Sequence, residues 1–167
     1  MSASTNVSNN DIADALVIFG ITGDLAKKMT YKSLFNLQQK GNLDVRVVGV
    51  AMDDITTEQL TLQMRSALEA EGVKVARDQF EELSKKVTYI RGDFSDPKTY
   101  EELKRVLAGS KAPLFYLEIP PFLFAPVVEN LCAVSLMERE RRSGHGPRRQ
   151  SPQRALFGLN RYSFGST

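Results

Sequence analysis

Four short apolar runs alternate with longer stretches in which apolar residues recur at helical spacing. The first run, 14–20, is nearly all apolar and rich in β-branched residues, which is typical of a strand buried on both faces of a parallel sheet. In the longer stretches, residues such as Leu60, Met64 and Leu68 share one helical face. The pattern predicts strands over 14–20, 45–51, 87–92 and 113–121, and helices over 24–40, 56–72, 76–86, 95–109 and 122–131.

Several predicted helices carry end signals in their sequence. Thr56, with Gln59 three residues later, has the pattern of a capping box at a helix start. Asp96 followed by Pro97 is a favourable pair of an N-cap and a first helical residue, because proline lacks the N–H that the first turn leaves unused. Gly72 is a typical helix stop.

The order of these elements predicts an α/β fold of the Rossmann-like, doubly wound kind. Strands that alternate with helices form a parallel sheet with helices on both faces, because parallel connections are right-handed. About four strands are expected, so the sheet is incomplete and its last strand has an open edge that favours self-association. Ligands of such sheets bind at the carboxyl ends of the strands, which brings the residues after the first, second and fourth strands to one edge.

The first strand ends in a glycine turn, Gly20 to Gly23, that leads into a helix. Glycine permits a tight turn and a close approach of a phosphate to the backbone, and the helix N-terminus favours an anion. The pattern is neither G-x-G-x-x-G nor a P-loop, because Thr22 takes the middle glycine position and no G-K-[ST] follows. A strand-to-helix turn that binds nothing is therefore an open alternative.

Composition narrows the class of protein. The 167 residues suit one domain, and the single cysteine, Cys132, allows no internal disulfide. The polar start has no signal-peptide pattern and no apolar run approaches the ~20 residues of a membrane span, so a cytoplasmic protein is expected. The net charge of +2 is uneven, because the residues from Cys132 onward hold seven arginines, no lysine and two glutamates. Neither a membrane nor a nucleic acid is an expected partner.

Four ordered pieces, "GITGDLAKKM", "VVGVA", "YIRGDFSD" and "FYLEIPPFLF", make the chain resemble the glucose-6-phosphate dehydrogenase family. The resemblance is to the N-terminal dinucleotide-binding domain and covers about residues 14–131. It implies an NADP- or NAD-dependent oxidoreductase of the pentose phosphate pathway, which oxidises glucose 6-phosphate to the 6-phosphogluconolactone.

The resemblance also assigns site residues by position. The turn and the first helical residues hold the pyrophosphate and the adjacent ribose, the residues of the Y-L-x-x-P-P motif wall the nicotinamide half, and Lys28 lies near substrate. The implied cofactor residues are Gly20, Thr22, Gly23, Asp24, Leu25, Leu117, Pro120 and Pro121. No catalytic residue and no metal ligand is assigned.

The residue after the second strand selects between the two cofactors. NADP-preferring relatives have an arginine there, whereas this chain has Met52, followed by Asp53 and Asp54. A carboxylate suits the free ribose hydroxyls of NAD and repels a 2′-phosphate, so NAD is expected to bind at least as readily as NADP. Arg46 lies too early in the strand to replace the missing arginine. Alternatively, the two aspartates are ordinary loop and helix-start residues.

The resemblance stops near Cys132. The family continues with E-K-P-F-G and R-I-D-H motifs and a large substrate domain, which are missing here. His145 has no acidic neighbour in the sequence to orient it as a base, and Cys132 has no partner for nucleophilic or metal chemistry. We therefore expect an N-terminal tail (1–13), a dinucleotide-binding domain (14–131) and an arginine-rich, disordered tail (132–167) that was translated out of frame.

Whether the chain is itself an enzyme is left open by the sequence. As a cofactor-binding half without the catalytic histidine motif, it should be inactive alone and should act on glucose 6-phosphate only if a catalytic domain is supplied, for example by a second chain. The alternative is a non-enzymatic dinucleotide-binding or interaction module whose basic tail contacts an acidic partner.

Overall fold

A computed structural model describes residues 12–137 and 155–156 of the chain. The sheet strands are β1 (Ala15–Phe19), β2 (Arg46–Ala51), β3 (Val87–Arg91), β4 (Pro113–Leu117) and β5 (Ala155–Leu156). The helices are α1 (Tyr31–Gln39), α2 (Thr57–Ala70), α3 (Arg77–Lys86), α4 (Pro97–Val106) and α5 (Phe124–Ala133), with a π-helical turn η1 (Ala26–Thr30) and a 3-10 turn η2 (Pro121–Leu123).

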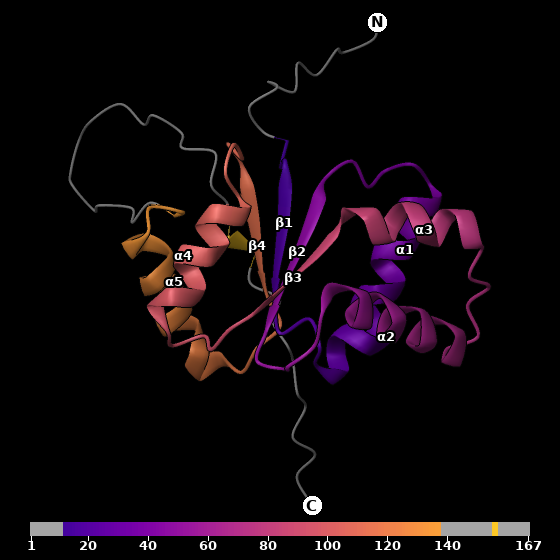
Figure 1. Ribbon diagram of the computed structural model, residues 1–167, viewed down its shortest axis with the longest axis horizontal. Helices are drawn as coiled ribbons and strands as arrows, with labels where there is room; N and C mark the ends of the chain where they lie inside the picture. The colour runs from indigo at the N-terminus through magenta and orange to yellow at the C-terminus, as the bar shows by residue number, and fades with distance from the viewer. Residues whose placement is uncertain (1–11, 138–154, 157–167) are drawn as a thin grey trace, which may run out of the picture.

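The sheet is parallel throughout and has the strand order β3-β2-β1-β4-β5. Val17 at the centre of β1 pairs with Val48 on one side and Phe115 on the other. Helices α1, α2 and α3 cover one face, and α4 and α5 cover the other (Figure 1). The predicted Rossmann-like, doubly wound fold is thereby confirmed.

Each face of the sheet has its own core. Val17 and Phe19 belong to the core under α4 and α5, whereas Ile18 belongs to the core under α1 to α3, because successive strand residues point to opposite faces. All three side chains are fully buried. On the α4 side, the ring of Phe19 stacks on that of Tyr100 at 6.0 Å. Burial on both faces explains why β1 is apolar without alternation.

The predicted helix caps are present. The backbone N–H of Gln59 donates to Thr56 Oγ1 at 3.2 Å, and the N–H of Thr56 donates to Gln59 Oε1 at 2.8 Å. Asp96 Oδ1 accepts from the N–H of Lys98 at 3.0 Å. Gly72 follows α2 with a φ of +74°, the left-handed conformation of a helix stop.

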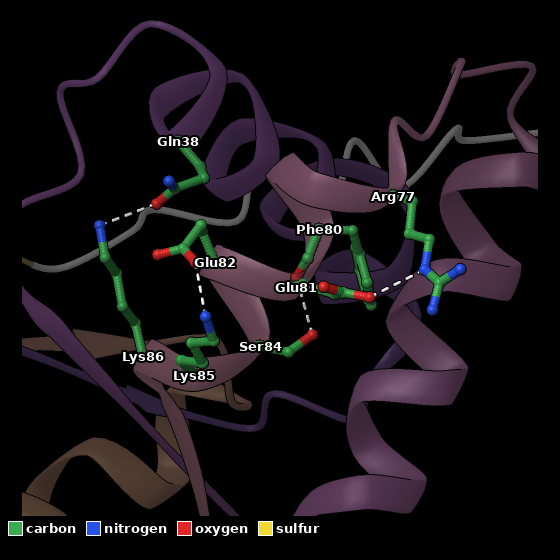
Figure 2. A network of polar contacts seen from close by, with 8 residues as sticks. All are labelled: Gln38, Arg77, Phe80, Glu81, Glu82, Ser84, Lys85 and Lys86. Carbon is green, nitrogen blue, oxygen red and sulfur yellow. Dashed lines mark hydrogen bonds and ion pairs between the residues drawn. The ribbon is translucent and has the colours of Figure 1, made fainter.

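Polar contacts tie α3 to α1 (Figure 2) and also to the loop that follows α1. Lys86 Nζ donates to Gln38 Oε1 at 2.9 Å and to the carbonyl oxygen of Leu43. Within α3, the contacts join residues three or four apart, as in the Arg77–Glu81 pair at 2.9 Å. Lys86 is therefore the residue of this network that joins separate elements.

The edge of the sheet at β4 differs from the expectation of a fully open edge. Ala155 and Leu156 form a short fifth strand that pairs with Phe115 and Tyr116. The sequence pattern could not predict this strand, because two residues show no period and their partners lie far away in the chain. The rest of the predicted tails, apart from residues 12–13 and 132–137, lies outside the described residues.

Packing continues past the end of α5. Val134, Leu136 and Met137 are partly buried against the core under α4 and α5. The N–H of Leu136 donates to the carbonyl oxygen of Leu131 at 2.9 Å, and Ser135 between them has a φ of +61°. This is the Schellman arrangement that closes many helices, with serine at the position where glycine is usual.

Candidate functional site

A cleft of about 230 Å³ lies at the carboxyl ends of β1, β2 and β4. This is the edge at which parallel α/β sheets bind their ligands, and the chain reverses its winding direction between β1 and β4. The walls come from the loops that follow all four long strands. The lining residues are Gly20, Thr22, Gly23, Ala51, Met52, Asp53, Phe94, Glu118, Ile119 and Pro120.

Gly20 forms the floor of the turn after β1. Its φ is +86°, and a Cβ atom there would lie 2.4 Å from the carbonyl oxygen of Glu118. Both facts exclude a side chain, because the left-handed backbone is strained for other residues and the carbonyl belongs to rigid backbone. The N–H of Gly23 donates to the carbonyl oxygen of Gly20 at 2.9 Å. The turn is therefore tight and leaves room above it for a ligand.

The helix that follows the turn starts at Asp24. Tyr31 fixes its first turns by donating from its buried hydroxyl to the carbonyl oxygen of Ile21 at 2.7 Å. Asp24 is exposed and Leu25 is half-buried, and neither lines the cleft. Between them and α1 lies the π-helical turn η1, which the sequence did not predict and which is a frequent feature of functional sites.

The β2 side of the cleft is built around Asp53. Thr22 Oγ1 donates to Asp53 Oδ2, which joins the glycine turn to this loop. Tyr89 Oη donates to the carbonyl oxygen of Asp53 at 2.8 Å, and burial together with the nearby Asp53 charge raises the pKa of Tyr89 to about 12. Met52 lines the cleft with a side chain that is 59% exposed.

Two arginines near β2 are engaged elsewhere. Arg91 Nη1 pairs with Asp54 Oδ1 at 2.8 Å, and both side chains are exposed. Arg46 lies at the start of β2, away from the cleft, where it donates to the carbonyl oxygens of Val106 and Ala108 at 3.1 and 3.3 Å. Arg46 thus caps the end of α4, a favourable place for a cation.

On the β4 side, Glu118 is a cleft residue that the sequence did not single out. Its Oε1 accepts from Thr30 Oγ1 of the π-helical turn. Its Oε2 is buried and, among the residues that the structure describes, has no hydrogen-bond partner. Burial raises the pKa of the Glu118 carboxyl, and the Thr30 hydrogen bond opposes this shift.

The structure brings six of the ten predicted cofactor residues to the cleft: Gly20, Thr22, Gly23, Met52, Asp53 and Pro120. The other four, Asp24, Leu25, Leu117 and Pro121, lie next to the cleft in sequence but do not line it. Leu117 is buried in the core, and the candidate substrate residue Lys28 is exposed on η1. Position at the end of a strand could have indicated Ala51, Glu118 and Ile119, and Phe94 follows β3 in the same way.

The described residues contain neither a helix long and apolar enough to cross a membrane nor a group of side chains arranged to hold a metal ion. His145, the single histidine of the chain, lies outside them.

Comparison with known proteins gives one consistent family. Residues 17–144 match the family model "Glucose-6-phosphate dehydrogenase, NAD binding domain". Glucose-6-phosphate 1-dehydrogenase 1 of Mycobacterium tuberculosis is 43% identical over 129 residues, which cover 77% of this chain and 28% of that protein. The enzyme of Schizosaccharomyces pombe is 34% identical over 139 residues, which cover 78% of this chain and 27% of that protein.

Solved structures agree. The crystal structure of glucose-6-phosphate 1-dehydrogenase from Mycobacterium avium matches with a TM-score of 0.76 and 41% identity, over 87% of this chain and 29% of that one. A glucose-6-phosphate dehydrogenase in complex with its substrate matches with a TM-score of 0.67 at 24% identity, which supports the fold alone. The chain thus spans between a quarter and a third of the length of these relatives.

The cleft fits the cofactor class that the family name states. A glycine turn without room for a side chain, a helix start and a carboxylate after β2 are the parts with which such sheets hold a nicotinamide dinucleotide, NADP or NAD. From the family match and this geometry, the chain belongs to the glucose-6-phosphate dehydrogenase family, whose NAD-binding domain its residues 17–144 match.

Proposed function

We propose that the chain binds the dinucleotide across this cleft, with the pyrophosphate above the turn from Gly20 to Gly23. The observation that carries the proposal is the close approach of Gly20 to the carbonyl of Glu118, which excludes a side chain at Gly20, a residue that lines the cleft. The adenosine ribose then lies toward Asp53 and the nicotinamide half toward Pro120, because β2 and β4 flank β1 on opposite sides. Asp24, Leu25, Leu117 and Pro121, which are adjacent to the cleft residues in the sequence, are proposed to complete the cofactor site.

We further propose that NAD binds at least as readily as NADP. The Asp53 carboxylate is held at the cleft by Thr22 and suits the two free hydroxyls of the NAD ribose. A 2′-phosphate there would meet this negative charge without a facing arginine from residues 12–137, since Arg46 is at the far end of β2 and Arg91 is paired with Asp54. Like charges in contact disfavour binding, whereas an arginine would pair with the phosphate.

The test is a calorimetric titration of the purified chain with NAD and with NADP. We expect equal or tighter binding of NAD. Asp53→Ala should weaken NAD binding by roughly tenfold, the loss of one or two hydrogen bonds to a charged group, and Met52→Arg should improve NADP binding without helping NAD. Exposed Asp78→Ala, on α3 and away from the cleft, is the control. A tenfold preference of the unmodified chain for NADP would overturn the proposal.

We propose that the chain binds the cofactor for the oxidation of glucose 6-phosphate but does not catalyse this reaction alone. The dinucleotide accepts a hydride from the sugar, and a base must remove the hydroxyl proton. No histidine stands among the described residues, and the chain spans 28% of the Mycobacterium tuberculosis relative. Lys28, exposed on η1, is proposed to lie near the sugar phosphate when a substrate domain is present.

An assay with glucose 6-phosphate and both cofactors tests whether the chain binds cofactor without catalysing the reaction alone. The expected result is binding of cofactor without turnover, and turnover on addition of a separately expressed substrate domain from a relative. Turnover by the chain alone would contradict the proposal. We further propose that the chain is cytoplasmic and that it can self-associate at the β4 edge. The family match gives no support to the alternative, an interaction module with a basic tail.

A further inference from the structure

Glu118 is an acidic group in a place that will hold an anion, if the proposed function is right. Glu118 is one of the lining residues of the cleft, and its own carbonyl oxygen is the backbone atom against which Gly20 packs. The glycine turn is where the pyrophosphate belongs, so Glu118 is a direct neighbour of the turn that would hold the two pyrophosphate charges. Two like charges at short range in a partly buried site repel each other strongly.

The surroundings of Glu118 do not compensate a negative charge. A carboxylate offers about four acceptor positions, and here one hydroxyl, that of Thr30, donates to Oε1 while Oε2 is buried without a partner in the described structure. A buried polar atom without a partner is costly, and more so when it is charged. This position therefore favours the uncharged carboxyl more than water does.

The neighbouring groups reinforce this conclusion. Burial raises the pKa of Tyr31 of α1 and of Tyr116 of β4, and the nearby Glu118 carboxyl adds to both shifts, so both phenols stay neutral. Asp53, across the cleft, is a second acid. The cations on η1, Lys27 and Lys28, are exposed, and the ion pairs found among the described residues do not include Glu118.

We propose that Glu118 is a cofactor-site residue that carries a proton when a dinucleotide's pyrophosphate occupies the cleft, so that binding takes up a proton there. The proton comes from the solvent and adds to the carboxylate oxygen, and no other bond changes. Affinity for the dinucleotide is then highest where the carboxyl is already neutral and falls as it ionises. This inference rests on the proposed function, because it requires a pyrophosphate in the cleft.

The experiment is calorimetric binding of ADP-ribose, which has the same pyrophosphate and no cationic ring, between about pH 5 and about pH 8. For the unmodified chain we expect the dissociation constant to rise at least about threefold over this range, a modest Coulomb effect for a partly screened pair. Titrations in buffers of different ionisation enthalpy should show proton uptake. Glu118→Gln keeps the shape and an acceptor for Thr30 but cannot ionise, so its binding should be independent of pH.

Two further variants separate Glu118 from its neighbours. Thr30→Val removes the hydroxyl that stabilises the charged carboxylate, so the fall in affinity should move to higher pH. Asp53→Asn removes the other acid of the cleft and should keep the pH dependence of the unmodified chain. The inference is overturned if unmodified chain binds equally at all pH values, or if Glu118→Gln keeps the same pH profile. Absence of ADP-ribose and NAD binding at every pH would overturn the proposed function as well.

Discussion

At Gly20, both the backbone conformation and the contact with the residue after β4 require glycine. Gly20→Ala would place a methyl group 2.4 Å from the carbonyl oxygen of Glu118 on a backbone with a φ of +86°. We expect a loss of at least about 2 kcal/mol in the free energy of unfolding, more than the 1–2 kcal/mol of left-handed strain alone, and loss of dinucleotide binding. Urea denaturation measures the first effect and calorimetry the second.

Gly41 offers the matched control for this substitution. It has a similar φ of +68°, but a Cβ atom there would meet nothing within 4 Å. Gly41→Ala should therefore cost only the left-handed strain, about 1–2 kcal/mol, and leave binding unchanged. Equal destabilisation by the two substitutions would show that the contact with Glu118 carries no energy.

The ionisation of Glu118 should also appear in the stability of the ligand-free chain. Its folded-state pKa is raised above the ordinary value of 4.5 by burial. Because the folded state then binds the proton more tightly than the unfolded state, stability is highest below the ordinary pKa. It should fall as the pH rises above 4.5 and level off above the raised pKa. Urea denaturation of the unmodified chain and of Glu118→Gln across this range should show the slope in the first and its loss in the second.

The two residues differ in how far the sequence could predict them. Gly20 could be predicted, because a glycine between an apolar run and a helix has a local reason to be there. The environment of Glu118 could not, because Thr30, the side-chain donor that the described structure gives it, lies 88 residues away. Position at a strand end indicates the correct edge of the sheet, but burial and partners there depend on how the loops pack.

At the scale of elements, Ser135, just after the C-terminal end of α5, has an unfavourable backbone conformation for its residue type. Ser135 is the non-glycine residue with a positive φ, 61°, among the described residues, and it is exposed. Ser135→Gly should stabilise the chain by about 1 kcal/mol, because the left-handed conformation costs a non-glycine residue that much or more. Thermal or urea denaturation measures the gain.

Ala133→Gly provides the opposite control two residues earlier. Ala133 ends α5 with ordinary helical geometry, where glycine costs about 0.5–1 kcal/mol relative to alanine. The two glycine substitutions should therefore change stability in opposite directions. A loss of stability in both would mean that the Schellman geometry at Ser135 does not persist in solution.

Whether a helix or strand could be predicted from the sequence depends on how close its signal lies to it along the chain. The capping box of α2 and the Asp96–Pro97 start of α4 were predicted because each signal lies within a few residues of the helix end. The π-helical turn η1 was not, because its sequence suits an ordinary helix and its geometry accompanies the contact of Thr30 with Glu118, the residue after β4. The strand β5 was missed for the same reason, since its partner strand lies far away in the chain.

At the scale of the whole molecule, the described part of the sheet has two weakly covered edges. β3 has no further strand on its outer side. The outer side of β4 is covered only in part among the described residues, because the two residues of β5 pair with Phe115 and Tyr116 alone. An uncovered parallel strand is a template for pairing with another chain. The relatives continue for more than two thirds of their length beyond the part matched here. Exposure of the β4 edge should therefore govern how the chain behaves in solution.

Removal of residues 138–167 tests this view, because it deletes β5 and leaves the other strands in place. The truncated chain should form dimers or larger species at concentrations at which the full chain remains monomeric, and sedimentation velocity would resolve them. Removal of residues 1–11 is the matched control, since it leaves the β4 edge as it is. If the chain without 138–167 stays monomeric at all concentrations, the β4 edge is not an association surface. In that case β5 does not prevent one copy of the chain from pairing with another.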